Sequence, residues 1–113
     1  MAQVTAVTTA EFGREVLFSP VPVVVDLYAD WCGPCRALAP LLERFARAYD
    51  GRLKFVKVNV DDESLVAEHY KASSVPTLLV FDRGQLVYRT AGLPDPRAFV
   101  ATLDRLAGAA AVS

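Results

Sequence analysis

Both cysteines of this chain lie in one short motif, Trp31-Cys32-Gly33-Pro34-Cys35. The motif directly follows a run of strand-forming apolar residues, 23–29, and its own residues are expected to open a helix. Two thiols separated by two residues in such a setting are typical of a redox dithiol rather than of a disulfide that stabilises a fold. Thiol–disulfide exchange is therefore the first chemistry that this sequence indicates.

The two thiols are expected to have different tasks. The N–H groups in the first turn of a helix lack partners within the helix, and the helix dipole adds partial positive charge there. Both effects favour the thiolate of Cys32, which we expect to be exposed and to attack a substrate disulfide. Cys35 lies about one turn further on and is expected to be shielded. It would then attack Cys32 in the mixed disulfide and release the reduced substrate.

A metal site and a purely structural disulfide are the alternatives for the same two cysteines. Zinc normally takes four nitrogen or sulfur ligands, whereas this chain offers two thiols and one distant imidazole, His69. A metal would therefore have to bridge two chains, and no metal is expected within one. A structural Cys32–Cys35 disulfide would close too small a loop to constrain the unfolded chain much. His69 is expected to be a solvated surface residue.

Asp26 interrupts an otherwise apolar strand. A carboxylate there costs several kcal/mol unless it is paired or protonated. Because the strand leads directly into the dithiol, we expect Asp26 to lie beneath Cys35, to have a raised pKa, and to accept the Cys35 proton. Lys57 interrupts the apolar strand 55–58 and is the natural charge partner. A buried Asp26–Lys57 ion pair without a catalytic part is the alternative interpretation.

A third signal is Val75-Pro76-Thr77, in which a proline precedes an apolar strand. Proline in such a place must take the first position of the strand or lie at a sheet edge. A cis bond before Pro76 would leave the Val75 backbone free to pair with something outside the fold. Since only about 5% of X–Pro bonds are cis, the residues alone do not establish this geometry.

The rest of the chain alternates between predicted strands and helices. Strands are expected at residues 4–7, 23–29, 53–60, 77–81 and 85–90. Helices are expected from a capping box at Thr8–Glu11, after the cysteines, at residues 63–70, and from Asp95-Pro96 to a stop at Gly108. This order predicts an α/β fold with a mixed five-stranded sheet flanked by four helices, in which crossovers make the early strands parallel and a hairpin adds antiparallel strands.

Length and composition fit one domain over residues 1–113. The chain is 53% hydrophobic and 22% charged with a net charge of −1, which excludes a disordered chain and gives no electrostatic reason to expect nucleic acid or an anionic membrane as partner. No segment approaches the ~20 apolar residues of a transmembrane helix. The N-terminal residues lack the basic start and apolar core of a signal peptide, so the expected compartment is the cytoplasm.

Taken together, these motifs resemble the thioredoxin family. The resemblance runs from about Val4 to Gly108. It rests on Asp26, the Trp-Cys-Gly-Pro-Cys motif, Pro40, Val75-Pro76-Thr77 and Gly92, in one order and spacing. It implies the thioredoxin fold and a monomeric, general protein-disulfide reductase. It also implies no bound cofactor, disulfide-containing protein substrates, and re-reduction by a thioredoxin reductase.

The resemblance also implies roles for individual residues. Cys32 would be the attacking thiolate and Cys35 the resolving thiol, with Asp26 assisting proton transfer and Lys57 nearby. The bond before Pro76 would be cis, and the Val75 backbone would hydrogen-bond an extended substrate segment. The apolar docking face would consist of Trp31, Gly33, Pro34, Val75, Pro76, Gly92 and Leu93.

Two other functions stay open for this sequence. One is a disulfide oxidase or isomerase that acts outside the cytoplasm, although Gly-Pro between the cysteines, instead of Gly-His, resembles the reducing members of the family. The other is a binding subunit of thioredoxin fold whose thiols are dispensable. Replacing both Cys32 and Cys35 by Ser distinguishes the enzyme from the binding subunit.

Overall fold

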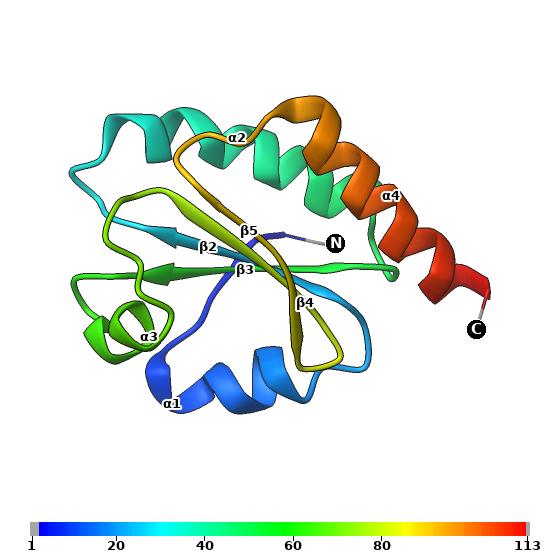
Figure 1. The fold of residues 1–113 in the computed structure, drawn as a ribbon, viewed down its shortest axis with the longest axis horizontal. Helices are drawn as coiled ribbons and strands as arrows, with labels where there is room; N and C mark the ends of the chain where they lie inside the picture. Colours follow the sequence, from blue (N-terminus) through cyan, green and yellow to red (C-terminus); the bar gives the residue numbers. More distant parts are fainter. Residues whose placement is uncertain (1–2, 113) are drawn as a thin grey trace.

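A five-stranded mixed sheet forms the centre of the protein (Figure 1), in a computed structural model that describes residues 3–112. The strands are β1 (Thr5–Ala6), β2 (Val23–Tyr28), β3 (Lys54–Asn59), β4 (Thr77–Asp82) and β5 (Gln85–Ala91). Their order across the sheet is β1-β3-β2-β4-β5, with β1, β3 and β2 parallel. β4 runs antiparallel to β2, and β5 antiparallel to β4. The predicted mixed topology is confirmed.

The helices cover both faces of this sheet. They are α1 (Thr9–Phe12), which continues as a π-helical turn η1 (Gly13–Leu17), then α2 (Gly33–Ala48), α3 (Ser64–His69) and α4 (Pro96–Val112). Figure 1 shows α2 and α4 together on one face, and α1 and α3 on the other. Within residues 3–112, no helix combines the length and the apolar character needed to cross a bilayer.

Two apolar layers hold the helices to the sheet. On the α2 and α4 side, Val24 and Val80 of the sheet belong to one buried cluster with Leu42 of α2 and Phe99 of α4. On the other side, Val25, Leu27 and Phe81 form a second buried cluster with residues of α1 and α3. Since β2 contributes to both clusters, it needs apolar residues on both of its faces. Its sequence meets that need everywhere except at Asp26.

The topology gathers five chain segments at one edge of the sheet. Because β1, β2 and β3 are parallel, the residues that follow each of them emerge at the same edge. The antiparallel β4 begins at this edge, and β5 ends there. The dithiol motif after β2, the Val75–Pro76 segment before β4 and Gly92 after β5 are thereby brought to one place, although up to 60 positions separate them.

Local signals predicted the helix starts better than the helix ends. The Thr8–Glu11 capping box is present in both directions. The predicted stop at Gly108 is wrong, because α4 continues to Val112. A glycine inside a helix costs only about 1 kcal/mol, and Leu106 and Ala107 remain buried in the core just before it. The alanines that follow Gly108 favour helix strongly, so the helix continues through it.

Candidate active site at the Cys32–Cys35 disulfide

Cys32 and Cys35 are joined in a disulfide at the start of α2, with their Cα atoms 5.2 Å apart. Cys32 is the N-cap residue, in an extended conformation, and its Sγ accepts a hydrogen bond from the Cys35 amide at 3.1 Å. Pro34 occupies the first turn, where its missing N–H is not needed. An N–H of the first helical turn thus points at the Cys32 sulfur, which is the environment that stabilises a thiolate.

Cys32 is buried, contrary to our expectation that it would be exposed. Each of the two cysteines has only 3% of its surface accessible. They form a small cluster with Ala29, against which Val60 and Val75 pack. The Cys32 Sγ lies 3.6 Å from the Val75 carbonyl oxygen. Part of the cover over this sulfur therefore comes from Val60 and Val75, which are distant from it in the sequence.

Asp26 and Cys35 line the same cavity, as the strand alternation predicted. This cavity has a volume of about 180 Å³ and also has Lys57 and Ala39 in its wall. Asp26 is 5% exposed, and its Oδ1 has no hydrogen-bond partner among the residues that the structure describes. Burial raises the pKa of Asp26 to about 7, against the opposing effect of the nearby Lys57 ammonium. A carboxyl group that exchanges its proton near neutral pH therefore faces the cavity beside Cys35.

Lys57 lies next to Asp26 in the parallel β2–β3 register. Its Nζ is 5.7 Å from the centre of the Tyr28 ring, a cation–π arrangement. No salt bridge within 4.0 Å joins Asp26 to Lys57, although the structure describes both residues. The alternative of a tight buried ion pair is therefore not realised, and Asp26 keeps an unpaired oxygen.

The segment before β4 has the geometry that the resemblance implied. The Val75–Pro76 peptide bond is cis. The Pro76 carbonyl accepts a hydrogen bond of 2.7 Å from the Gly92 N–H, and Gly92 adopts φ +84°, which favours glycine. The Thr77 hydroxyl donates to the Ser74 carbonyl at 2.7 Å. These bonds connect the segment before β4 to the segment after β5.

The residues of the predicted docking face differ in exposure. Trp31 and Leu93 are 68% and 58% exposed, and Gly33 and Pro34 are exposed as well. Val75 and Gly92 are half-buried. Pro76 is buried, because it lies directly before β4, which has a strand on either side of it in the sheet. It therefore shapes the backbone of this face but offers little surface of its own.

Sequence reasoning missed two residues that follow β3. The Trp31 Nε1–H donates to Asp61 Oδ2 at 2.9 Å, which holds the exposed indole beside the dithiol. Val60 packs against the two cysteines. The signal that would have found both is the topology, since β2 and β3 are parallel and the residues after them must share an edge.

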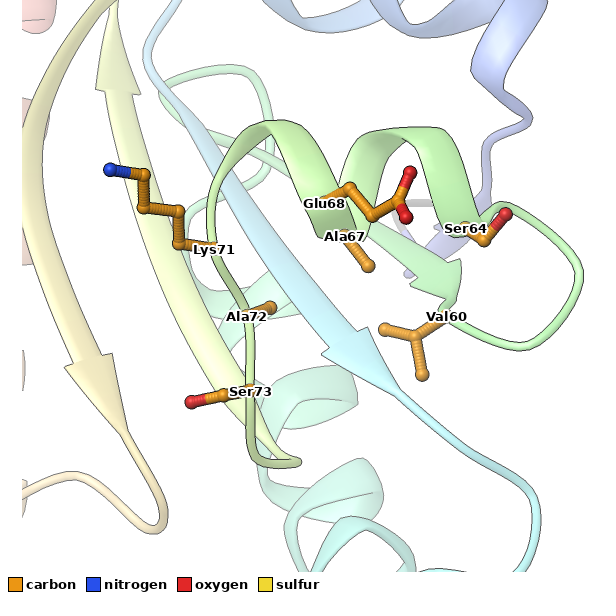
Figure 2. Close-up of a pocket in the computed structure, with 7 residues that line it drawn as sticks. All are labelled: Val60, Ser64, Ala67, Glu68, Lys71, Ala72 and Ser73. Atoms are coloured by element: carbon orange, nitrogen blue, oxygen red, sulfur yellow. The ribbon is translucent and has the colours of Figure 1, made fainter.

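A shallow groove of about 460 Å³ lies beside the cysteine cluster. Figure 2 shows its lining, with Val60 after β3, Ser64, Ala67 and Glu68 on α3, and Lys71, Ala72 and Ser73 on the segment that leads toward Val75. Val60 belongs both to this groove and to the packing around the disulfide, so the two features adjoin. Among the described residues, no group of three or more His, Cys, Asp or Glu side chains is placed to hold a metal ion.

Comparisons with known proteins agree with this geometry. The thioredoxin family model matches residues 3–105. Thioredoxin 1 of Nostoc sp. is 43% identical over 93% of this chain and 98% of its own length, and Thioredoxin 1 of Synechococcus elongatus is 44% identical over the same shares. The chloroplastic M-type thioredoxin of Chlamydomonas reinhardtii is 39% identical over 92% of this chain and 74% of its own length. The chain therefore belongs to the thioredoxin family of protein-disulfide reductases.

Proposed function

We propose that this protein reduces disulfides of other proteins through Cys32 as nucleophile and Cys35 as resolving thiol. The observation that carries the proposal is the disulfide at the N-terminus of α2, in which Cys32 Sγ accepts the Cys35 N–H. In the reduced protein, the same N–H and the positive end of the helix dipole would favour the Cys32 thiolate. The disulfide form corresponds to the product of one turnover.

The reaction transfers two electrons from the Cys32–Cys35 dithiol to the substrate disulfide and needs no bound cofactor. The Cys32 thiolate attacks one sulfur of the substrate disulfide, forms a mixed disulfide and displaces the other substrate sulfur as a thiolate. Cys35 gives its proton to the Asp26 carboxylate and attacks Cys32 Sγ. This forms the Cys32–Cys35 disulfide and releases the second substrate sulfur. That Asp26 and Cys35 line one cavity supports this proton transfer.

Lys57 adjusts the pKa of Asp26 and does not form an ion pair that would keep its carboxylate permanently charged. Its ammonium lowers the pKa of Asp26, while burial raises it, and the balance falls at about 7. A group that is half ionised near neutral pH both accepts and returns a proton readily.

Substrate docking is proposed for the face around the disulfide. An extended substrate segment would hydrogen-bond the Val75 backbone, as an added strand. The exposed Trp31 and Leu93 side chains, with Gly33, Pro34 and Gly92, would provide apolar contact beside the dithiol, while the buried Pro76 would shape the backbone of this face.

The cellular setting is part of the same proposal. We infer that residues 1–113 act as one thioredoxin domain and as a monomer in the cytoplasm. A thioredoxin reductase would supply electrons, and the protein would pass them to protein disulfides and so contribute to cell redox homeostasis.

The reduction potential of the Cys32–Cys35 pair tests the direction of this reaction. The protein is equilibrated in defined thiol–disulfide buffers, and the fluorescence of Trp31, the only tryptophan, reports the redox state. We expect a potential below that of the glutathione pool, because only then does the dithiol drive substrate reduction. A potential well above it would identify an oxidase or isomerase and would contradict the cytoplasmic setting.

Two single substitutions test the assigned roles. Cys35→Ser should accumulate a mixed disulfide between Cys32 and the substrate, visible by mass spectrometry, because the resolving thiol is absent. Cys32→Ser should form no such adduct and should reduce no protein disulfide. An adduct on Cys35 in the Cys32→Ser variant, at the rate of the Cys35→Ser variant, would reverse the assignment.

A further inference from the structure

Arg89 reaches from the edge strand β5 to the end of α3. Its Nη1 donates to the Tyr70 carbonyl, and its Nη2 donates to the Lys71 carbonyl at 2.9 Å. Arg89 pairs in register with Leu79, so it lies in the middle of the β4–β5 hairpin. The neighbouring Tyr88 packs into the core on the α2 and α4 side. The alternation of the strand therefore puts Arg89 on the opposite face, where α3 lies.

The carbonyls that Arg89 contacts need a donor. The Tyr70 carbonyl, at the C-cap of α3, has no partner within the helix and lies at the negative end of its dipole, so a cation there is favourable. Lys71, two residues after the end of α3, has φ 54°, the left-handed conformation that most residues other than glycine avoid. The planar guanidinium offers two parallel N–H donors, and here it satisfies two successive carbonyls at that strained turn.

The turn that Arg89 holds is the start of the segment that carries Val75. Residues 71–76 run from the end of α3 to β4 without forming a helix or a strand. Within this segment, Ala72 N–H donates to the Ala67 carbonyl at 2.9 Å, and Ser74 accepts the Thr77 hydroxyl. Lys71, Ala72 and Ser73 also form one wall of the groove in Figure 2.

We propose that Arg89 is a positioning residue for substrate docking. By holding the Tyr70 and Lys71 carbonyls, it fixes where segment 71–76 starts, and with it the place of the Val75 backbone beside Cys32. The proposal rests on the proposed docking of an extended substrate at Val75. Arg89 itself touches neither the disulfide nor the reacting sulfur atoms, so its effect is on substrate binding and not on the exchange step.

The test compares Arg89→Gln with Val87→Gln. Val87 lies two residues away on β5, at the bulge in the β4–β5 pairing, and is 45% exposed, so both substitutions place the same side chain on the same strand. A third variant, Arg89→Lys, keeps the charge but replaces the two-pronged donor by a single ammonium. Each variant is assayed with insulin, a protein disulfide, and with 5,5′-dithiobis(2-nitrobenzoate), a small disulfide that needs no strand pairing.

We expect Arg89→Gln to raise KM for insulin about fivefold, because the two exposed hydrogen bonds to Tyr70 and Lys71 are lost, with kcat little changed. Its rate with the small disulfide should change less than about twofold. Arg89→Lys should give an intermediate KM, and Val87→Gln should match the wild type. Equal losses with both substrates in Arg89→Gln, or an unchanged KM for insulin, would overturn the proposal.

Amide hydrogen exchange separates positioning from general destabilisation. Exchange at Ser73, Ser74 and Val75 should accelerate in Arg89→Gln, while the slowest amides of β2 should keep their wild-type rates. Equal acceleration in both regions would mean that Arg89 only stabilises the fold, and the proposal would fail. A wild-type protein that reduced neither substrate would instead contradict the proposed function, and this is seen before any substitution is made.

Discussion

The two ends of β2 are surrounded by very different residues. Where the strand begins, Val23 pairs with Phe81 on β4, and both side chains are buried in an apolar cluster. Toward the other end of the strand, Asp26 is buried with an Oδ1 that has no hydrogen-bond partner among the described residues, and the disulfide follows the strand. Val23 and Asp26, three positions apart on one strand, thus lie in an apolar and a reactive environment.

The two ends of β2 contribute to the free energy of unfolding with opposite signs. Fully burying a Val, Leu or Phe side chain contributes about 1.5–3 kcal/mol to the free energy of unfolding. Burying a carboxyl group without a partner acts in the opposite direction, and the group responds by a raised pKa. The apolar end of the sheet therefore holds the fold together, while the Asp26 end tolerates an unfavourable group that can transfer a proton.

The largest expected effect on the free energy of unfolding comes from creating a cavity in the apolar cluster around the start of β2. Phe81 is 2% exposed and touches the rings of Phe12 and Tyr70. Phe81→Ala should lower the free energy of unfolding by about 3–5 kcal/mol, because it removes a large buried side chain and leaves a cavity. Urea denaturation measures the loss. The rate of disulfide reduction per folded molecule should stay at the wild-type value, and a large drop in that rate would mean that the two ends are coupled.

At the disulfide end of β2, removing the carboxylate of Asp26 should stabilise the protein. The pKa of Asp26 is raised from 3.8 to about 7. Between these pH values, the folded protein holds a proton that the unfolded chain has released, so the stability of the wild type falls as the pH rises through this window. Asp26→Asn has no such proton to lose. Its stability advantage should therefore grow from pH 4 to pH 7 and reach about 2–4 kcal/mol at pH 8.

Urea denaturation of both proteins from pH 4 to pH 8.5 checks this prediction. Asp50→Asn is the matched control, because it makes the same chemical change at an exposed position and should give a curve parallel to that of the wild type. Parallel curves for Asp26→Asn would contradict the raised pKa. The same variant should reduce protein disulfides more slowly, and an unaltered rate from pH 6 to pH 9 would exclude Asp26 as the proton acceptor.

The features that the sequence predicted correctly are those determined within one segment. The spacing of Cys32 and Cys35, the alternation that places Asp26 toward α2, and the capping box at Thr8 each depend on a few neighbouring residues. They are all present in the structure. The order of strands and helices followed from hydrophobic periodicity, and it was enough to predict a mixed sheet.

What the sequence could not predict depends on contacts between distant segments. Cys32 is buried because Val75, 43 positions away, lies against it. The hydrogen bond from Trp31 to Asp61 exists because two parallel strands end at one edge of the sheet. The absence of a direct Asp26–Lys57 salt bridge depends on where a long lysine side chain extends, which alternation does not determine.

The smallest expected effect concerns Thr8, a residue near the disulfide end of the sheet that we expect to stabilise the fold without affecting the redox reaction. Thr8 lies at this end of the sheet and caps α1, accepting the Glu11 N–H at 3.3 Å, while the Glu11 carboxylate accepts the Thr8 N–H at 3.0 Å. These bonds lower the pKa of Glu11. Thr8→Ala should cost about 1 kcal/mol, the usual cost of losing a helix cap, and Thr8→Ser should cost less because the hydroxyl remains.

The reduction potential of the Cys32–Cys35 pair should be the same in both Thr8 variants and in the wild type. α2 is capped by the sulfur of Cys32 and α1 by the hydroxyl of Thr8, so the two helix starts share a geometry but only one contains a redox group. A potential that shifted in Thr8→Ala but not in Thr8→Ser would show that the cap of α1 reaches the dithiol. In that case, a residue that stabilises the fold would also affect the redox chemistry, and the two kinds of residue would not be confined to opposite ends of the sheet.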